Sequence, residues 1–326
     1  MLCGAILISF FLVVGVFGKL TATPSLIPLG YAMTSASLTE PAERQSCRES
    51  KSFADMPLKE LTKAVPELKG LEAAETQEEL APHLQKLGEG VKVLFASFPD
   101  ITSIEDTRQE RLSREMSVME SVSEEFRYLA LAHPFNGGVT LEEYRTDSKG
   151  RRIEPGGTGR GTLVITKGFV SQPLFFHPLY QSESTFRYLG RQIVGGRQAF
   201  VIAFAQRPDK ARLVGGIEIG GTAHRVLFQG VAWITAADYH IVRMRTDLLP
   251  PLPKDLERET TEIHFAAVRL KDVPTALQLP REVVVTLAWR GTVLRNQHRY
   301  SDFRLFRVQT RVLTEENRHA PEPPPR

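Results

Sequence analysis

Residues able to do acid–base, nucleophilic or metal chemistry are scattered along the chain without the spacing that such sites need. The eight histidines include no pair at a helical or hairpin interval typical of metal ligands; they are His83, His133, His177, His224, His240, His264, His298 and His319. No Gly-x-Ser-x-Gly nucleophile elbow occurs, and the adjacent carboxylates Glu142 and Glu143 would point to opposite faces of a strand. We therefore predict no catalytic residue, no metal and no cofactor; a hydrolase with strand-borne residues is the remaining enzymatic alternative.

Two further features that could carry chemistry have simpler explanations. The run Gly156, Gly157, Gly159 and Gly161 is not followed by a Lys-Ser or Lys-Thr pair or by a helical pattern, so we interpret it as a loop and not as a phosphate-binding loop. Cys47 is the only cysteine outside the apolar N-terminal run. We expect a free thiol there, with an intermolecular disulfide or a reactive nucleophile as the alternatives.

The segment Phe169–Tyr180 (FVSQPLFFHPLY) combines aromatic side chains with two prolines. Proline cannot donate a ladder hydrogen bond, so this segment cannot be a regular central strand. Two interpretations stay open: a plug that closes one side of a barrel core, or a mobile lid over an apolar cavity. In the second case the candidate ligand-binding side chains are Phe169, Phe175, Phe176 and Tyr180.

The elements that must position these side chains begin with a helical region from residue 57 to 98, which is rich in Leu, Lys and Glu. Its best helix is predicted to begin at Thr76, in a capping box with Glu79, and to end at Pro99. Pro82 should kink this helix or delay its regular part. Apolar residues recur at steps of three and four and form one stripe: Leu80, Leu84, Leu87, Val91, Leu94, Phe95 and Phe98. Four of them complete the candidate apolar lid: Leu87, Val91, Leu94 and Phe98.

From about Ile104 the hydrophobic period changes toward two, which predicts strands. A long strand runs to Leu131, although Arg108–Glu120 would also tolerate a helix. Val139–Thr146 is a second strand, closed by a turn at 147–150.

The clearest strands follow. A hairpin joins Thr185–Gln192 to Ala199–Gln206 through Gly195 and Gly196, which adopt positive φ without steric strain. Five more strands are predicted: Ala223–Thr235, Ile241–Thr246, Glu262–Leu270, Glu282–Trp289 and Tyr300–Val308. Two tryptophans should lie on these strands and be mostly buried, Trp233 and Trp289. The predicted fold class is α+β, with N-terminal helices packed on a large antiparallel, curved β-sheet that forms a half-barrel or unclosed barrel.

The N-terminus has the pattern of an export signal. Leu2–Gly18 is an unbroken apolar run ended by Lys19, the length of a signal-peptide core and marginal for a bilayer span. No Lys or Arg precedes it. We expect cleavage near Ala32–Ala36 and location in the periplasm or cell envelope, with an uncleaved anchor as the alternative. The expected domains are a signal peptide (1–36), an N-terminal helical region (37–103), a β half-barrel (104–310) and a disordered tail (311–326).

Charge is divided unevenly along the chain. Residues 1–125 carry 12 Lys and Arg against 19 Asp and Glu, and residues 126–326 carry 29 against 19. The basic half could favour an envelope protein or an anionic membrane surface, although a solvated sheet face rich in Arg has the same composition. No nucleic-acid recognition motif is present, so we expect no nucleic-acid partner.

The hairpin motifs resemble those of the LolA/LolB-like superfamily, the outer-membrane lipoprotein carriers. The residues that carry this resemblance are Gly196–Ile202, Gly230–Ile234, Ile241–Arg243 and the pair Leu279-Pro280; Phe98-Pro99 and Tyr300–Phe303 are similar to uncharacterised exported bacterial proteins. The resemblance implies an unclosed β-barrel with an apolar cavity for acyl chains and helices as its lid. Thr235 stands where these proteins more commonly have Asp.

The sequence is therefore consistent with two functions. The first is a non-catalytic periplasmic or envelope protein that binds or carries a hydrophobic acyl-chain ligand, a lipid or a lipoprotein. The second is a structural or interaction module that docks on an envelope partner through its basic sheet face and has no ligand cavity. A cavity of several hundred Å³ with apolar walls would favour the first.

Overall fold

The computed structural model describes residues 6–7, 13–14, 51–135, 138–153, 167–219 and 222–306. Several predictions lie outside these residues: Cys47, the cleavage region Ala32–Ala36, the glycine run at 156–161 and the tail at 311–326. The apolar N-terminal run is described only at β1 (Ile6–Leu7) and β2 (Val13–Val14), which pair antiparallel with β9 (Leu213–Ile219). Removal of that run stays a prediction.

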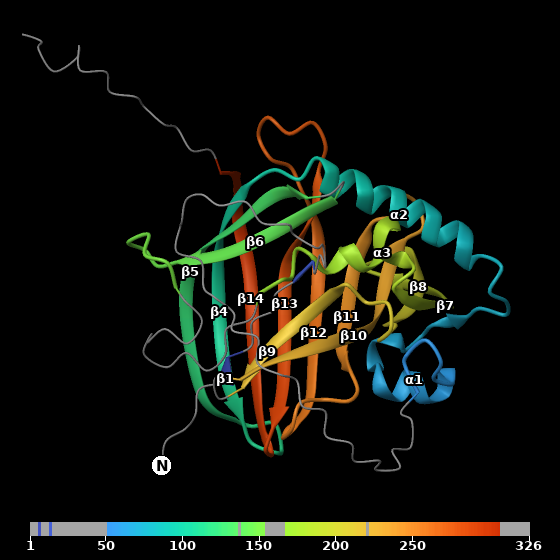
Figure 1. Cartoon of the computed structure of the whole chain (residues 1–326), viewed down its shortest axis with the longest axis horizontal. Helices are drawn as coiled ribbons and strands as arrows, with labels where there is room; N and C mark the ends of the chain where they lie inside the picture. Colours follow the sequence, from blue (N-terminus) through green and yellow to red (C-terminus); the bar gives the residue numbers. More distant parts are fainter. Residues whose placement is uncertain are drawn as a thin grey trace, which may run out of the picture.

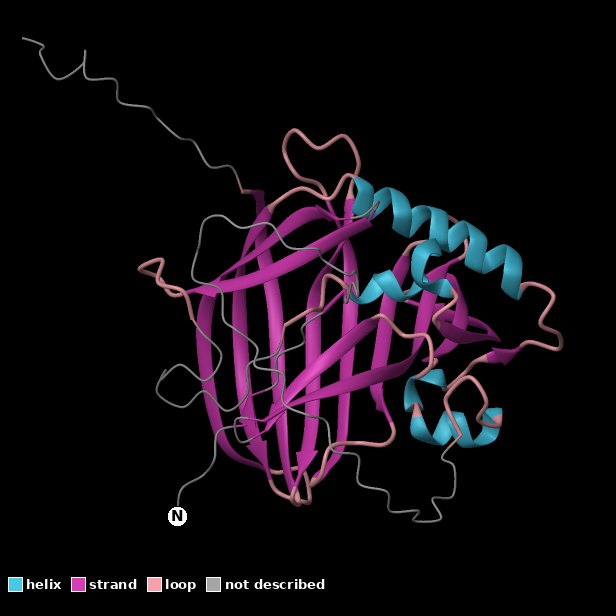
Figure 2. Ribbon diagram, in the orientation of Figure 1, coloured by secondary structure: helices cyan, strands magenta, loops and turns pink. Residues whose placement is uncertain are grey.

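The remaining strands of the described chain form one antiparallel sheet (Figures 1 and 2). Its order is β3-β7-β8-β10-β11-β12-β13-β14-β4-β5-β6, and β9 pairs with β10 beside this path. The bounds are β3 Glu72–Ala73, β4 Ile101–Leu112, β5 Val118–Phe135, β6 Gly138–Thr146, β7 Ser184–Val194, β8 Arg197–Gln206, β10 Thr222–Thr235, β11 Ile241–Leu249, β12 Leu256–Val268, β13 Leu277–Trp289 and β14 Thr292–Leu305. Within the described residues β3 and β6 end the path without pairing to each other, so the sheet is an open half-barrel. The predicted antiparallel, unclosed sheet is confirmed.

The long strand predicted to reach Leu131 is present as β5, but the alternative helix at Arg108–Glu120 is wrong. β4 extends to Leu112 and reverses through a tight turn, in which Met116 has a φ of 65°. The period is two on both sides of this turn, with odd-numbered buried positions from Ile101 to Gln109 and even-numbered ones from Phe126 to Ala130, so the period alone does not locate the reversal.

Two hairpins show how glycine affects the prediction. Gly195 and Gly196 have φ of 55° and 77°, and they join β7 to β8 as predicted. β9 is not predicted, because Gly215 and Gly216 weaken its strand pattern. A Cβ at Gly215 would lie 2.5 Å from the Phe228 ring, so the glycine allows that ring to pack against the β9 backbone.

The N-terminal helical region divides into α1 (Leu58–Ala64), the 3₁₀ turn η1 (Pro66–Leu68) and α2 (Leu80–Ala96). The predicted capping box is wrong, because α2 begins at Leu80 and Glu79 is its N-cap without a side-chain hydrogen bond. The residues before it are held by the sheet instead: Gln77 Nε2 donates to Tyr188 O at 2.9 Å, and Gln77 Oε1 accepts from Tyr188 N at 2.8 Å. Pro82 lies in the first turn of α2, where its missing N–H has no helical acceptor.

The two faces of the sheet carry separate apolar cores. We call the side with Ile202, Met244 and Val283 the inner face; its core includes buried residues of α2 and of the segment Phe169–Tyr180. The outer face of β7, β8 and β10 packs against the α1–η1 region in a second core: Phe53, Leu61, Val65, Leu68, Leu189, Ala199, Val201, Ala203, Val231 and Trp233. The N-terminal helices therefore contribute to both sides, and not to a single lid.

The two tryptophans are buried to different extents. Trp233 is fully buried, and its Nε1 donates to Gln192 Oε1 at 2.8 Å, so that prediction is confirmed. Trp289 is partly buried at the end of β13, where it packs against the inner-face core and the Arg290 guanidinium lies 4.6 Å from the ring centroid. The prediction that Trp289 is mostly buried is therefore confirmed as well.

Candidate functional site

The aromatic segment Phe169–Tyr180 fills the apolar part of the inner face. It folds into the 3₁₀ helix η2 (Gln172–Phe176) and the short helix α3 (Pro178–Gln181), and its four candidate aromatic side chains are buried. The Phe175 ring centroid lies 5.1 Å from that of Phe204 and 5.6 Å from that of Phe228. Because these rings pack closely against the sheet, the segment closes this side of the core in the conformation described, as the plug interpretation expects.

Helix α2 supplies the second half of the candidate lid, and it lies beside α3 (Figure 1). Of the predicted stripe, Leu87, Val91 and Phe98 are buried in the inner-face core, and Leu94 is partly buried against it. Gln181 joins the two helices by donating from Nε2 to Leu84 O at 2.9 Å. The structure thus brings the predicted residues of α2 and of the aromatic segment into one cluster.

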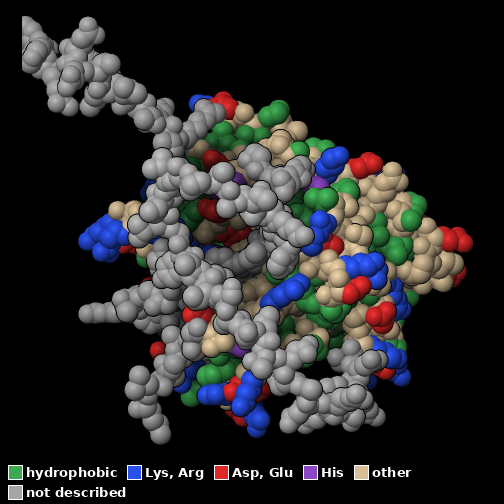
Figure 3. All heavy atoms as spheres, in the orientation of Figure 1, with side chains coloured by type: hydrophobic (Ala, Val, Ile, Leu, Met, Phe, Trp, Pro, Cys, Tyr) green, Lys and Arg blue, Asp and Glu red, His purple; other side chains and the backbone are tan. Residues whose placement is uncertain are grey.

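A groove of about 450 Å³ runs along α2. Its apolar wall combines residues of α2, of β12 and of the starts of β11 and β13: Leu87, Val91, Leu94, Phe265, Ile241 and Leu277. Polar side chains stand at its rim, where Lys86 Nζ lies 5.2 Å from the Tyr239 ring centroid. On the face of the molecule that Figure 3 shows, hydrophobic side chains lie among charged ones. A groove of this size with an apolar wall and a polar rim has the properties of small-molecule sites.

The opposite part of the inner face is polar, and a buried ion pair lies at its centre. Arg145 of β6 donates from Nε and Nη2 to Glu105 Oε2 and Oε1 of β4, at 2.5 and 2.7 Å. His298 Nδ1 lies 2.9 Å from Glu105 Oε1, and Tyr300 Oη donates to the same oxygen at 2.8 Å. All four side chains are buried, so strands β4, β6 and β14 are joined through one carboxylate.

The electrostatics of this cluster keep Glu105 ionised. Burial by itself would raise the pKa of Glu105, but the Arg145 guanidinium and His298 outweigh this effect and hold that pKa at about 2. Glu105 in turn raises the pKa of Arg145 against the opposing effect of burial. Burial also lowers the pKa of His298. A buried pair with this geometry is a structural cross-link, because removing one partner would leave an uncompensated charge.

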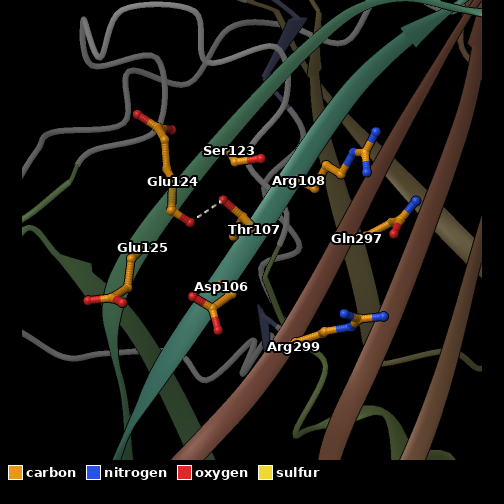
Figure 4. Close-up of a pocket in the computed structure, with 8 residues that line it drawn as sticks. All are labelled: Asp106, Thr107, Arg108, Ser123, Glu124, Glu125, Gln297 and Arg299. Carbon is orange, nitrogen blue, oxygen red and sulfur yellow. Dashed lines mark hydrogen bonds between the residues drawn. The ribbon is translucent and has the colours of Figure 1, made fainter.

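A second hollow, of about 410 Å³, lies over β4, β5 and β14 (Figure 4). Oppositely charged side chains alternate around it: Asp106, Arg108, Glu124, Glu125 and Arg299. The Arg residues nearby are paired with carboxylates, for example Arg108 Nε with Glu110 Oε1 at 2.8 Å and Arg299 Nε with Glu282 Oε1 at 3.6 Å. This part of the sheet is therefore not a uniformly basic surface.

Sequence reasoning missed the Glu105 cluster. The only available signal was parity: Glu105, Arg145 and His298 occupy inward positions on their strands, where apolar residues are the norm. The predicted opposite directions of Glu142 and Glu143 are found, since Glu142 is exposed and Glu143 faces inward.

Among the described residues, no group of three His, Cys, Asp or Glu side chains is placed to hold a metal ion. Within the same residues, no helix is both long and apolar enough to cross a membrane.

No protein-family model matches the chain, and no curated protein matches it. A putative outer membrane lipoprotein-sorting protein domain from Vibrio parahaemolyticus is similar in structure, with 14% identity, a TM-score of 0.35, and coverage of 72% of this chain and 94% of that one. A LolA superfamily protein from Nitrosomonas europaea has 11% identity, a TM-score of 0.30 and coverage of 72% and 98%. A DUF1329 family protein from Desulfovibrio piger has 8% identity, a TM-score of 0.37 and coverage of 69% and 92%.

The hairpin motifs resemble the same group as two of these structures, the lipoprotein-sorting protein domain and the LolA superfamily protein. The chain is an open antiparallel half-barrel with an apolar groove beside α2.

Proposed function

We propose that the protein binds a hydrophobic acyl-chain ligand in the groove beside α2 and carries it, without catalysis, in the periplasm or cell envelope. The observation that carries this proposal is the volume of about 450 Å³ with an apolar wall, which continues into the inner-face core at Leu87 and Val91. Typical ligand pockets have volumes of 300–1,000 Å³ and mostly apolar walls. Lipids and lipoproteins are the proposed sources of the chain.

The position in the envelope rests on the apolar run Leu2–Gly18. On the same basis we propose that residues 1–36 are a signal peptide, residues 37–103 the helical region and residues 104–310 the half-barrel.

The alternative function, docking through a basic sheet face, has less support, since Arg108, Arg295 and Arg299 each form an ion pair on the sheet. Paired surface cations attract an anionic partner less than unpaired ones.

Gly90 offers a direct test of the groove. It lies on the groove wall in the middle of α2, and a Cβ added there meets no atom within 4 Å. Replacing Gly by a larger residue in a helix interior also favours the helix, because Gly has the greater backbone entropy. Gly90→Phe should therefore fill the groove without unfolding the protein, and Gly90→Ala is the matched control.

The experiment is a titration of a fluorescent fatty acid into the purified wild type and both variants, together with thermal melts. We expect saturable binding by the wild type and by Gly90→Ala, and at least a tenfold loss of affinity for Gly90→Phe with no decrease in melting temperature. Native mass spectrometry of the wild type should detect co-purified lipid. Wild-type protein that binds no chain probe, or Gly90→Phe that binds as well as Gly90→Ala, would contradict the proposal.

A further inference from the structure

Strand β9 lies at an edge of the sheet. On one side it pairs with residues 222–226 of β10, and the two strands form a ribbon that leaves the main path of the sheet (Figure 1). Leu213 and Ile217 of β9 are buried in the inner-face core, so one face of the ribbon is packed there. The other side of β9, which we call the outer edge, is where β1 and β2 pair.

The hydrogen bonds at the start of β9 show which of its residues present their backbone groups at the outer edge. Leu213 O accepts from Gln206 Nε2, and Gln206 Oε1 accepts from Phe228 N of β10 at 2.8 Å, so the Leu213 carbonyl points toward β10. In an antiparallel ladder the N–H and C=O of one residue face the same neighbour, and successive residues alternate. Three residues therefore direct their N–H and C=O to the outer edge: Val214, Gly216 and Glu218.

Two stretches of the apolar N-terminal run pair at the positions that these groups favour. Leu7 of β1 lies opposite Glu218, and Val13 of β2 lies opposite Val214, both in antiparallel register. The four residues of the run that pair with β9 are all apolar: Ile6, Leu7, Val13 and Val14. The outer edge thus holds an extended apolar segment through backbone pairing, which is the geometry of β-strand addition.

The sequence of β9 lacks the features that protect edge strands against pairing. Such strands commonly carry Lys or Pro, contain a bulge, or are covered by another element. The sequence of β9, LVGGIEI, has no Lys, Arg or Pro, and its register to β10 is continuous from Gly215 to Ile219. Within the described residues, the strands that cover the outer edge are β1 and β2. Removal of the N-terminal run would therefore open this edge.

We propose that the outer edge of β9 binds an extended apolar segment of a partner polypeptide, which pairs antiparallel in the positions that β1 and β2 occupy in this chain. Main-chain hydrogen bonds supply the affinity of such a site, and the side chains of the partner supply its selectivity. The inference goes beyond the proposed function, because the residues that line the groove beside α2 include none from β9.

The first experiment uses the full chain, so it does not depend on removal of the signal peptide. The double variant Leu7→Pro/Val13→Pro loses the two N–H groups that face β9, and we call it the open-edge variant. Ile6→Pro/Val14→Pro is the matched control, because its lost N–H groups face away from β9.

The measurement is residue-resolved hydrogen exchange. We expect the Val214 and Glu218 amides to exchange at least about tenfold faster in the open-edge variant than in the wild type or the matched control. Gly215 and Ile217 should not change, because their N–H groups face β10. Equal exchange of Val214 and Glu218 in all three proteins would overturn the pairing and the proposal.

The second experiment adds the extended segment in trans. The probe is a fluorescein-labelled peptide with the sequence of residues 4–16, followed by added lysines for solubility. It should bind the open-edge variant saturably and the wild type at least about tenfold more weakly, because the tethered run has the higher effective concentration. N-methylation of the probe at Leu7 and Val13 should weaken its binding at least about tenfold, whereas N-methylation at Ile6 and Val14 should not.

A substitution in β9 tests the site from the other side. In the open-edge variant, Val214→Pro removes an N–H that faces outward, so it should abolish binding of the probe and leave the pairing with β10 intact. Val214→Thr is the matched control, because it retains the N–H and a β-branched side chain. The fluorescent fatty acid should bind both variants as it binds the wild type, since Val214 does not line the groove.

The remaining outcomes each decide the proposal. Binding of the probe that is insensitive to the site of N-methylation, or that survives Val214→Pro, would overturn recognition by strand pairing. An open-edge variant that binds no probe would also overturn the proposal, and if it dimerises in a manner that Val214→Pro abolishes, the occupant is a second copy of this chain. Failure of the wild type to bind the fatty acid would contradict the proposed function and leave this inference unchanged.

Discussion

Glu259 should make the stability of the protein fall as the pH rises from about 5 to 8. Its side chain lies on the inner face of β12 and is 1% exposed. Thr261 Oγ1 donates to its Oε1 at 2.6 Å, and no described residue is a partner for Oε2. Burial raises the pKa of Glu259 to about 8; the Thr261 hydrogen bond opposes this increase and the charge of Asp247 adds to it.

The magnitude follows from proton linkage. An unfolded chain releases the Glu259 proton near its ordinary pKa of 4.5, whereas the folded protein retains it up to about pH 8. Between these values each pH unit lowers the free energy of unfolding by about 1.4 kcal/mol, or about 5 kcal/mol over the whole interval. The contribution is fully present below pH 4.5 and is lost as the pH rises through 8.

The measurement is urea denaturation at pH 5, 6, 7 and 8 for the wild type and for Glu259→Gln. The variant cannot ionise, so the difference between the two unfolding free energies should change by about 1.4 kcal/mol per pH unit. Glu257→Gln is the matched control, because Glu257 is exposed on the same strand and the Gln oxygen can still accept from Gly291 N. If the wild type and Glu259→Gln show parallel pH profiles, Glu259 is ionised in the folded protein and the argument is wrong.

Other predictions concern the remaining buried groups and the N-terminus. Glu105 has the opposite sign of linkage: its pKa of about 2 gives about 3 kcal/mol of stability above pH 4.5 that is lost as the pH falls toward 2, and Glu105→Gln should remove that acid-side dependence in the same denaturation series. Phe176→Ala should lower the free energy of unfolding by about 3–5 kcal/mol, since its ring is fully buried; a loss below 1 kcal/mol would indicate a lid that opens freely. Trp233→Ala should destabilise more than Trp289→Ala, because only Trp233 is fully buried, and equal losses in denaturation would contradict this ranking. N-terminal sequencing of the mature protein should find a start near residue 37, and recovery of Met1 would instead indicate an anchor.

Local features of the fold could be predicted from the sequence because they depend on residues a few positions apart. The alternation along β7 and β8 and the turn at Gly195 and Gly196 involve near neighbours only. The stripe Leu87, Val91 and Phe98 similarly follows from helical spacing, and its burial agrees with the prediction. The lid residues of the aromatic segment were recognised because two prolines in an apolar run exclude a central strand.

Tertiary structure decided the features that join distant parts of the chain. The start of α2 is one, because Gln77 bonds to the Tyr188 backbone, 111 residues away, and so replaces a local capping box. The polar half of the inner face is another, since Glu105 meets Arg145 and His298 across 40 and 193 residues. A shift of one residue in strand register would turn these side chains to the opposite face. Their burial and their pKa values therefore depend on strand pairing that local sequence patterns do not specify.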